Sequence, residues 1–291
     1  MKYGKMMFIV SLLFILFLVG CNEKQTIKDD EVIDEPEVEV ETDESDNEDS
    51  TDDLDESEVD DVTQDDSLEN LDDDDSEVEV MYQINQANWA VEPITDEADS
   101  NVVLLTIDDA PDKYALEMAK TLKELEVPAI FFVNGHFIQT EEKHEILKEI
   151  YQMGFSIGNH TYTHPNLGQI SEEEQKQEII ELNDLIEEII GERPKFFRAP
   201  FGVNTDNTKQ VVEQEGMVLM NWTYGYDWES AYMEADALAD IMVNTEYLRD
   251  GANLLMHDRE WTSGALADIV TGLRDKGYDF VDPNQIQRPS K

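Results

Sequence analysis

The stretch from Asn101 to Pro111 reads NVVLLTIDDAP, and it decides the fold around it. An apolar run leads directly into two adjacent carboxylates, Asp108 and Asp109, and a proline follows two residues later. This pattern predicts a buried strand whose carboxyl end carries both acids. Two neighbouring carboxylates are costly to ionise together without a cationic partner. A bound metal ion is one such partner, and it would leave the other carboxylate free to act as a base.

From about residue 96, short apolar segments alternate with amphipathic ones. The pattern predicts strands near 102–107, 129–133, 155–157, 195–197, 217–222, 252–256 and 278–281. It predicts helices near 112–126, 141–153, 171–190, 208–215, 234–248 and 262–277, with Ser171 and Glu174 as a capping box and Thr262 as the last N-cap. Strands that alternate with helices indicate an α/β fold of parallel βα units.

Polar residues follow the carboxyl ends of these predicted strands. They are Asp108 and Asp109, His160 and His164, Arg198, Asp227, and His257. In a TIM-like βα barrel all strand ends meet on one face, and that face carries the active site. A doubly wound open sheet also places ligands at strand ends and is the alternative, although no glycine-rich phosphate loop follows the first strand.

Residues 1–20 have the composition of an export signal. Lys2 and Lys5 precede an apolar run, 6–19, that is shorter than the ~20 residues of a membrane-spanning helix. The run ends in Leu-Val-Gly before Cys21, the only cysteine of the chain, so no intrachain disulfide can form. This end resembles a bacterial lipobox, in which Cys21 is lipidated and becomes the mature N-terminus. A plain signal peptide or an uncleaved anchor is the alternative.

A strongly acidic segment follows the signal. Residues 29–80 contain no Lys or Arg and are dominated by Asp, Glu, Ser and Thr. Such a segment cannot bury enough apolar surface to offset its ordering entropy. We therefore predict a disordered acidic linker at 21–95 and a folded domain at 96–291. A weak calcium-binding tail is the alternative, although the regular spacing of a calcium loop is missing.

The formal net charge of the chain is −49, and residues 81–291 alone carry 39 acidic and 16 basic residues, a net of −23. A domain this acidic is not expected to bind nucleic acid.

Two histidines spaced as His160-x3-His164 are a weak signal alone. With a carboxylate from another strand end they form a set that suits a divalent metal with open coordination positions. The same set would fit a non-haem iron oxygenase, which is one alternative. Taken singly, Arg198 and Asp227 could form surface ion pairs, and Trp228 could belong to the core.

Five segments together resemble the motifs of the NodB-homology polysaccharide deacetylases, carbohydrate esterase family four (CE4), in family order. TIDDAP from Thr106 resembles TFDDGP, HTYTHP from His160 resembles HSxxHP, RAPFG from Arg198 resembles RxPYG, Asp227-Trp228 resembles the end of DxxDW, and Leu255-Met256-His257 resembles LxH. The chain is therefore identified as a member of this family, over the range from Thr106 to His257.

The resemblance implies a distorted (β/α)7 barrel that removes N-acetyl groups from amino-sugar polymers. By match, Asp109, His160 and His164 would bind the metal, usually zinc, although cobalt, manganese and nickel are also used. The other implied roles are Asp108 as general base, His257 as general acid, Arg198 and Asp227 as their respective partners, Trp228 and Leu255 as walls of the acetyl pocket, and the backbone N–H of Phe201 as an oxyanion donor.

Some positions depart from the family pattern. Ala110 replaces a glycine, which matters only if that residue needs a positive φ. Ile107 and Phe201 replace aromatic residues that are common there, and Tyr224 stands where the first Asp of the fourth motif is usual.

The predicted protein is a monomeric, metal-dependent deacetylase of peptidoglycan or a chitin-like glycan. We expect it to lie outside the cytoplasm, anchored to the outer face of the bacterial membrane through lipidated Cys21. The second alternative to this enzyme, besides the oxygenase, is a catalytically inactive glycan-binding lipoprotein on the same scaffold.

Overall fold

The structure is a computed structural model that describes residues 78–289 of the chain. The predicted signal at 1–20, the predicted lipidation site Cys21 and the acidic run up to residue 77 lie outside the described residues.

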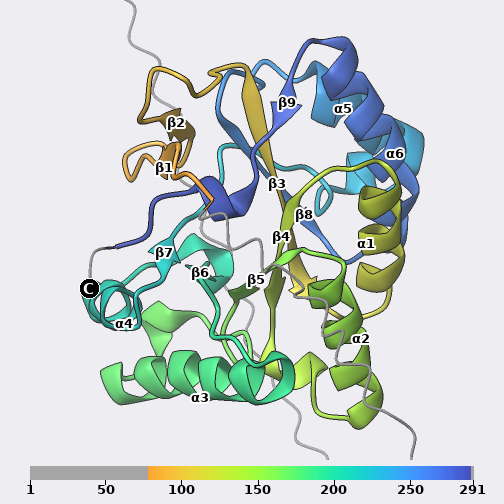
Figure 1. The fold of residues 1–291 in the computed structure, drawn as a ribbon. Helices are drawn as coiled ribbons and strands as arrows, with labels where there is room; N and C mark the ends of the chain where they lie inside the picture. Colours follow the sequence, from red (N-terminus) through yellow and green to blue (C-terminus); the bar gives the residue numbers. More distant parts are fainter. Residues whose placement is uncertain (1–77, 290–291) are drawn as a thin grey trace, which may run out of the picture. The chain divides into compact units, whose positions relative to one another are not determined.

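A seven-stranded parallel sheet forms the centre of the described domain (Figure 1). Its strands are β3 (Val102–Ala110), β4 (Ala129–Val133), β5 (Ser156–Asn159), β6 (Phe196–Phe197), β7 (Val218–Leu219), β8 (Ala252–His257) and β9 (Asp279–Phe280). The spatial order is β7-β6-β5-β4-β3-β8, and β9 pairs with the start of β3. All these strands pair in parallel, so the seven predicted strands are confirmed.

The barrel is distorted where β7 should meet β8. In the described part of the chain, one isolated bridge, between Tyr224 and Leu254, links the segment after β7 to β8. The N–H of Thr223 donates to the carbonyl of Asn253 at 2.8 Å, and that of Leu255 donates to the carbonyl of Tyr224 at 2.9 Å. The result is the distorted (β/α)7 barrel that the sequence predicts.

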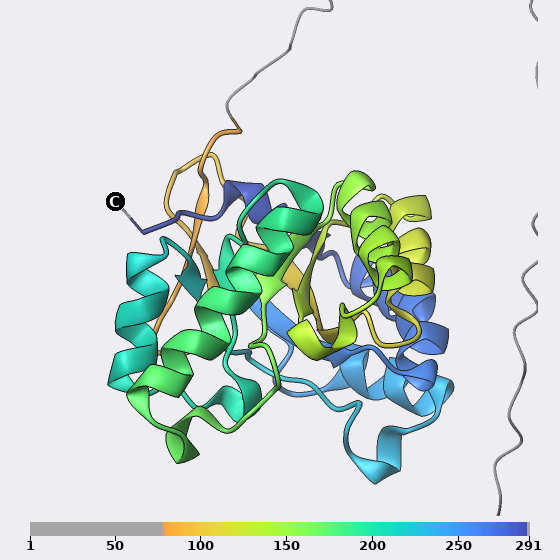
Figure 2. The same ribbon diagram turned by 90° about the horizontal axis from the view of Figure 1, so that it is seen from below.

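Six helices cover the sheet from outside (Figures 1 and 2). They are α1 (Ala115–Glu124), α2 (Glu141–Gln152), α3 (Glu172–Ile190), α4 (Asp206–Gln214), α5 (Ala235–Asn244) and α6 (Glu260–Asp275). Neighbours touch in the order α5-α6-α1-α2-α3-α4, which follows the strand order of a barrel. No helix within residues 78–289 has the length and apolar character needed to cross a bilayer.

The helix termini agree with the sequence in one case and differ in another. The capping box of Ser171 and Glu174 begins α3, and Gly191 ends it in the left-handed conformation, as expected. The prediction that Thr262 caps the last helix was wrong. Helix α6 begins at Glu260, and the Thr262 hydroxyl instead donates a hydrogen bond to Asp227 at 2.8 Å.

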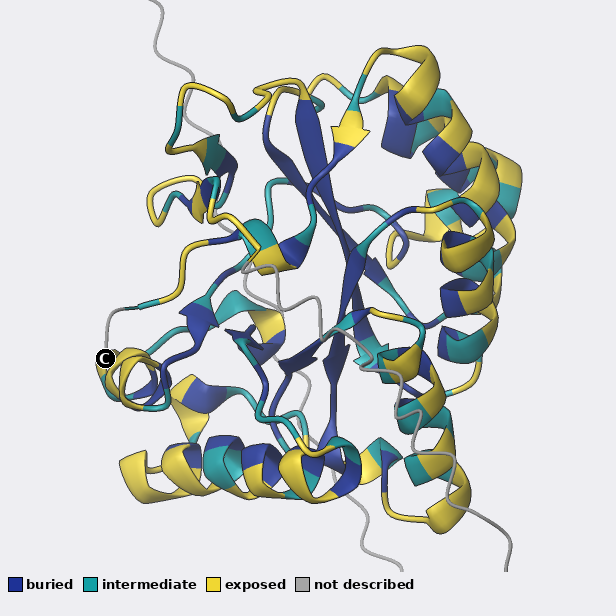
Figure 3. Ribbon diagram, in the orientation of Figure 1, coloured by how far each residue is buried: buried dark blue, intermediate teal, exposed yellow. Residues whose placement is uncertain are grey.

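Strand β3 is buried on both faces, which explains the apolar run with which it begins. Its odd-numbered residues, such as Leu105, pack toward the surrounding helices. Its even-numbered residues, such as Leu104, join Phe132 and Phe196 in a separate cluster inside the barrel. Figure 3 shows this buried centre beneath helices whose outer faces are exposed.

An N-terminal hairpin corrects the predicted domain boundary. Strands β1 (Tyr82–Ile84) and β2 (Val91–Pro93) pair antiparallel, and their buried side chains join the cluster inside the barrel. The prediction that the linker continues to residue 95 was therefore wrong, because the folded domain already includes β1 and β2. Strands of three residues carry almost no periodic signal, and this hairpin is buried only because the barrel accepts its apolar side chains.

The hairpin contact predicts an unequal effect of two glycine substitutions. Gly251 has φ +71°, and an added Cβ would lie 2.0 Å from the Val91 carbonyl oxygen, so Gly251→Ala should displace the hairpin. Gly154 has φ +97° but open space around the same position, so Gly154→Ala tests backbone strain alone. We expect a loss of unfolding free energy of about 1 kcal/mol for Gly154→Ala and clearly more for Gly251→Ala, measured by urea unfolding. Equal losses would contradict this hairpin packing.

Candidate active site

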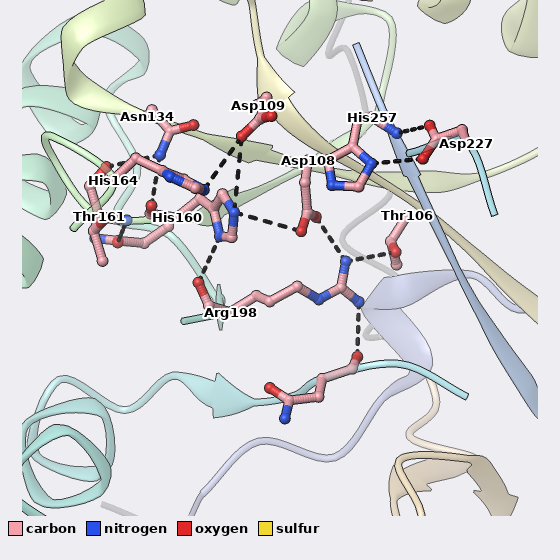
Figure 4. Close-up of polar contacts among 12 residues, drawn as sticks. Thr106, Asp108, Asp109, Asn134, His160, Thr161, His164, Arg198, Asp227 and His257 are labelled. Carbon is pink, nitrogen blue, oxygen red and sulfur yellow. Dashed lines mark hydrogen bonds and ion pairs between the residues drawn. The ribbon is translucent and has the colours of Figure 1, made fainter. Parts of the chain in front are cut away.

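The three predicted metal ligands meet at the carboxyl ends of β3 and β5 (Figure 4). Oδ1 of Asp109 lies 3.6 Å from Nε2 of His164 and 3.9 Å from Nε2 of His160. One potential ligand atom from each residue lies within 4.8 Å of the other two. Two imidazole nitrogens and a carboxylate oxygen are a donor set that suits zinc and related divalent metals.

A hydrogen bond fixes which nitrogen His160 presents. Its Nδ1 lies 2.7 Å from the carbonyl oxygen of Arg198, which can only accept, so Nδ1 carries the proton. Nε2 is therefore the ring nitrogen left to bind a metal, and it lies on the side of Asp109. A hydrogen bond from the ring nitrogen that does not bind the metal commonly orients a metal-binding histidine.

The protonation states of the other two residues also fit metal binding. Burial lowers the pKa of His164, and the nearby charge of His160 lowers it further, against the opposing effect of the carboxylates. Burial alone would raise the pKa of Asp109, but the charges of three histidines and Arg259 outweigh it and lower the pKa. A neutral imidazole and an ionised carboxylate are the forms that bind metals.

Asp108 lies beside this ligand group and forms an ion pair with Arg198. Its Oδ1 accepts from Nη1 of Arg198 at 2.6 Å, and both side chains are buried, at 2% and 0% exposure. The same Nη1 donates to Thr106 Oγ1 at 2.7 Å, and Nη2 donates to the Asn221 carbonyl at 2.8 Å. The guanidinium also lies over the Phe132 ring, 4.4 Å from its centroid. Asp108 is thus held in one orientation beside the metal ligands.

His257, at the end of β8, forms the opposite side of the site with Asp227. Nδ1 of His257 lies 2.7 Å from one Asp227 oxygen, and the backbone N–H of His257 donates to the other oxygen at 2.6 Å. Burial alone would lower the pKa of His257, but the hydrogen bond and charge of Asp227 outweigh it and raise the pKa. Since Nδ1 is bound to Asp227, Nε2 is the ring nitrogen left for a ligand.

These groups line one cleft of about 620 Å³. It contains every predicted site residue within the described range except Arg198, which lies buried beside it. Trp228 and Phe201 are exposed aromatic residues of the cleft, at 45% and 64%. Their rings pack edge-on against His257 and His164, at centroid distances of 5.5 and 5.0 Å. The individual catalytic and binding roles stay predictions.

The departures from the family motifs have structural explanations. Ala110 is not among the residues with positive φ, so its methyl group carries no such penalty; the strained conformation falls on Asp109, with φ +62°. Tyr224 is buried and points away from the cleft, where its hydroxyl donates to the Met242 carbonyl at 2.8 Å.

Several residues of the site were missed from the sequence. Thr106 supports Arg198 from within the first motif, and Thr262 and Trp261 donate to Asp227 from the start of α6. Arg259 donates to Asp109 at 2.8 Å. Thr106 belongs to the first motif, whereas no motif includes Arg259, Trp261 or Thr262. For these three, closeness to His257 in the chain was the one usable signal.

Comparison with known proteins places this site in a family. A family model described as polysaccharide deacetylase matches residues 95–220. A Bacillus cereus protein named peptidoglycan-N-acetylglucosamine deacetylase is 30% identical over 196 residues, which are 65% of this chain and 69% of that protein. The chain belongs to the polysaccharide deacetylase family, CE4.

Solved structures support the same assignment and confirm the barrel. The peptidoglycan deacetylase PdaC from Bacillus subtilis is 30% identical with a TM-score of 0.57, over 64% of this chain and 90% of that one. A CE4 pseudoenzyme from Bacillus anthracis is 28% identical with a TM-score of 0.58, over 64% of this chain and 65% of that one. CE4 deacetylases are metal-dependent in general, and the Asp-His-His group is a potential site for that metal.

The Asp227 contact predicts a shift in the titration of His257. Because the folded-state pKa is raised, protonated His257 should stabilise the fold below its ordinary pKa, and this stabilisation should be lost as pH rises through the folded pKa. Asp227→Asn should lower the pKa of His257, measured by NMR of the ring protons in metal-free protein. Asp240→Asn, on the exposed face of α5, is the matched control. An unchanged pKa in Asp227→Asn would contradict this coupling.

Proposed function

We propose that this protein hydrolyses N-acetyl groups of an amino-sugar polymer, peptidoglycan or a chitin-like glycan, with a divalent metal, most favourably zinc, at Asp109, His160 and His164. The observation that carries the proposal is that the cleft contains a potential metal-binding group and, separate from it, a potential base and a potential acid. Three residues form a ligand group, and a buried carboxylate and a histidine that are not part of that group flank it. The chemistry that the metal supplies when bound is Lewis acidity, which polarises a carbonyl and lowers the pKa of water.

Asp108 would accept the proton of the attacking water. Its Oδ1 is engaged by Arg198, whereas its Oδ2 lies toward the ligand group, 3.5 Å from Nε2 of His160. The free oxygen is therefore on the side where water must be activated. Arg198 holds the carboxylate in place, as a general base requires.

His257 would protonate the departing amine. Asp227 holds the proton on Nδ1 and stabilises the charged ring, so that Nε2 can carry a second proton and deliver it into the cleft. Thr262 and Trp261 bind Asp227 in turn and hold it in position.

The cleft walls suit an acetylated sugar. Leu255 is a buried residue of the cleft lining and Trp228 is a half-exposed one, a pair that can enclose a methyl group while the sugar lies outside. Phe201, with φ +58°, is the predicted source of a backbone N–H for the developing oxyanion. The named activities of the relatives from Bacillus cereus and Bacillus subtilis support a peptidoglycan substrate.

The pseudoenzyme relative makes the inactive glycan-binding protein the alternative to exclude. Asp108→Asn tests both readings, because Asn keeps the shape of the side chain but cannot accept the water proton. With the metal-loaded full chain, we expect wild type to release acetate from N-acetylglucosamine oligomers or peptidoglycan. Asp108→Asn should be slower by about 10²–10⁴-fold while still binding metal stoichiometrically.

Asp275→Asn, on the exposed end of α6, is the control and should retain full activity. Full activity in Asp108→Asn would reject the proposed base. Absence of acetate release from wild type, with metal bound and glycan retained, would instead support the binding protein.

We also propose that the protein is a lipoprotein on the outer face of the bacterial membrane, anchored through Cys21 and carried on its acidic linker. The support is the sequence alone: a basic start, a short apolar run and the lone cysteine after Leu-Val-Gly. An acyl chain at Cys21, together with a second chain, would give stable anchoring without a membrane-spanning helix.

A substitution at Cys21 tests the anchor. Cys21→Ser should abolish incorporation of radiolabelled fatty acid and move the protein from the membrane fraction to the medium, because serine offers no thiol for lipidation. Ser11→Cys in that background places a thiol outside the lipobox and should not restore labelling. Labelling that persists in Cys21→Ser would reject this attachment site.

A further inference from the structure

Arg259 is a cleft residue outside all five family motifs. It precedes α6 as its N-cap, two residues after His257. Its side chain is 35% exposed, and it is the only Lys or Arg that lines the cleft in the described part of the chain.

The guanidinium of Arg259 divides the two oxygens of Asp109 between different partners. Nη2 donates to Oδ2 of Asp109 at 2.8 Å, whereas Oδ1 is the oxygen that lies 3.6 Å and 3.9 Å from the histidine Nε2 atoms. One oxygen thus faces the ligand group and the other is occupied by a charge-assisted hydrogen bond.

Both acids of the Asp-Asp pair therefore have an arginine of their own. Asp108 has Arg198, which the third motif supplies, and Asp109 has Arg259. The first pair is fully buried, whereas the second lies at the edge of the cleft, with Asp109 at 14% exposure. A positive charge beside each of two adjacent carboxylates offsets their mutual repulsion.

The backbone around Arg259 is anchored to β3 and to the loop after it. Nη1 of Arg259 donates to the Asp258 carbonyl at 3.0 Å. The buried Asp258 side chain accepts from the backbone N–H groups of Lys113 and Tyr114, and its own N–H donates to the Asp108 carbonyl at 3.0 Å. Arg259 is consequently held at a fixed place relative to Asp109.

We propose that Arg259 is a positioning residue that restricts Asp109 to binding the metal through Oδ1 alone. This inference rests on the metal site of the proposed function. A carboxylate that used both oxygens would take a further coordination position, and catalytic metal sites need such positions open for water and substrate. Arg259 would therefore keep the metal accessible.

Cobalt spectroscopy of the full chain tests the inference without requiring turnover. Co²⁺ with few ligands absorbs visible light more strongly than Co²⁺ with more ligands. We expect the visible band of the Co²⁺-loaded protein to weaken in Arg259→Met, because Asp109 becomes free to bind through both oxygens. The band should be largely retained in Arg259→Lys, which keeps a cationic donor. Arg249→Met, which removes an exposed arginine that does not line the cleft, should leave it unchanged.

The spectrum decides the question better than the metal affinity does. Loss of a positive charge would strengthen cation binding, whereas loss of an orienting hydrogen bond would weaken it. Activity of Arg259→Met should fall about 10-fold or more, as it does when other residues that hydrogen-bond to a metal ligand are replaced. Arg259→Gln carries the same spectral expectation if the methionine variant does not fold.

An unchanged cobalt spectrum in a folded Arg259→Met or Arg259→Gln protein would overturn the inference and leave the proposed function intact. Failure of the wild-type protein to bind Co²⁺ or Zn²⁺ at all would instead overturn the metal site on which both depend.

Discussion

The buried ion pair between Asp108 and Arg198 is the interaction on which the rest of the site depends. Both side chains are almost fully removed from water, so each charge has lost its hydration and needs the other. Arg198 also contacts Thr106, the Asn221 carbonyl and the Phe132 ring. Its own carbonyl accepts a hydrogen bond from Nδ1 of His160. One residue therefore orients the proposed base and a proposed metal ligand together, and it ties β3 to β6 and the segment after β7.

The backbone at the site is strained in a way that this scaffold can hold. Asp109, Thr161, His164 and Phe201 all have positive φ, although none is glycine. Such conformations cost about 1–3 kcal/mol each and persist where the surrounding structure determines them. Here Asp109 lies near the carboxyl end of β3, and the other three follow β5 or β6. The strain turns side chains from separate strands toward one point, which regular strand ends alone would not achieve.

The sequence predicted the barrel well because its signals are local and repeated. Strand β3 begins with the apolar run Val102 to Leu105, as a strand buried on both faces should, and the capping box of α3 depends only on Ser171 and Glu174. The hairpin of β1 and β2 escaped prediction because tertiary packing, not periodicity, buries it. The residues of the site divide in the same way, into those with a local sequence signal and those placed by tertiary packing. The motifs gave the residues that reach the cleft, whereas the supporting contacts of Thr262 and Arg259 depend on how α6 approaches β3 and the Asp227 loop.

The family includes a pseudoenzyme, so the charges in the cleft, rather than family membership, distinguish catalysis from binding. Amide hydrolysis needs a base that is ionised and an acid that is protonated in the same site at the same pH. Arg198 places its positive charge against Asp108, and Asp227 favours the protonated form of His257 at the neighbouring strand end. A protein that only bound glycan would have no need to maintain these two buried pairs, each of which is costly to desolvate. Their joint presence is the physical reason to favour catalysis over binding.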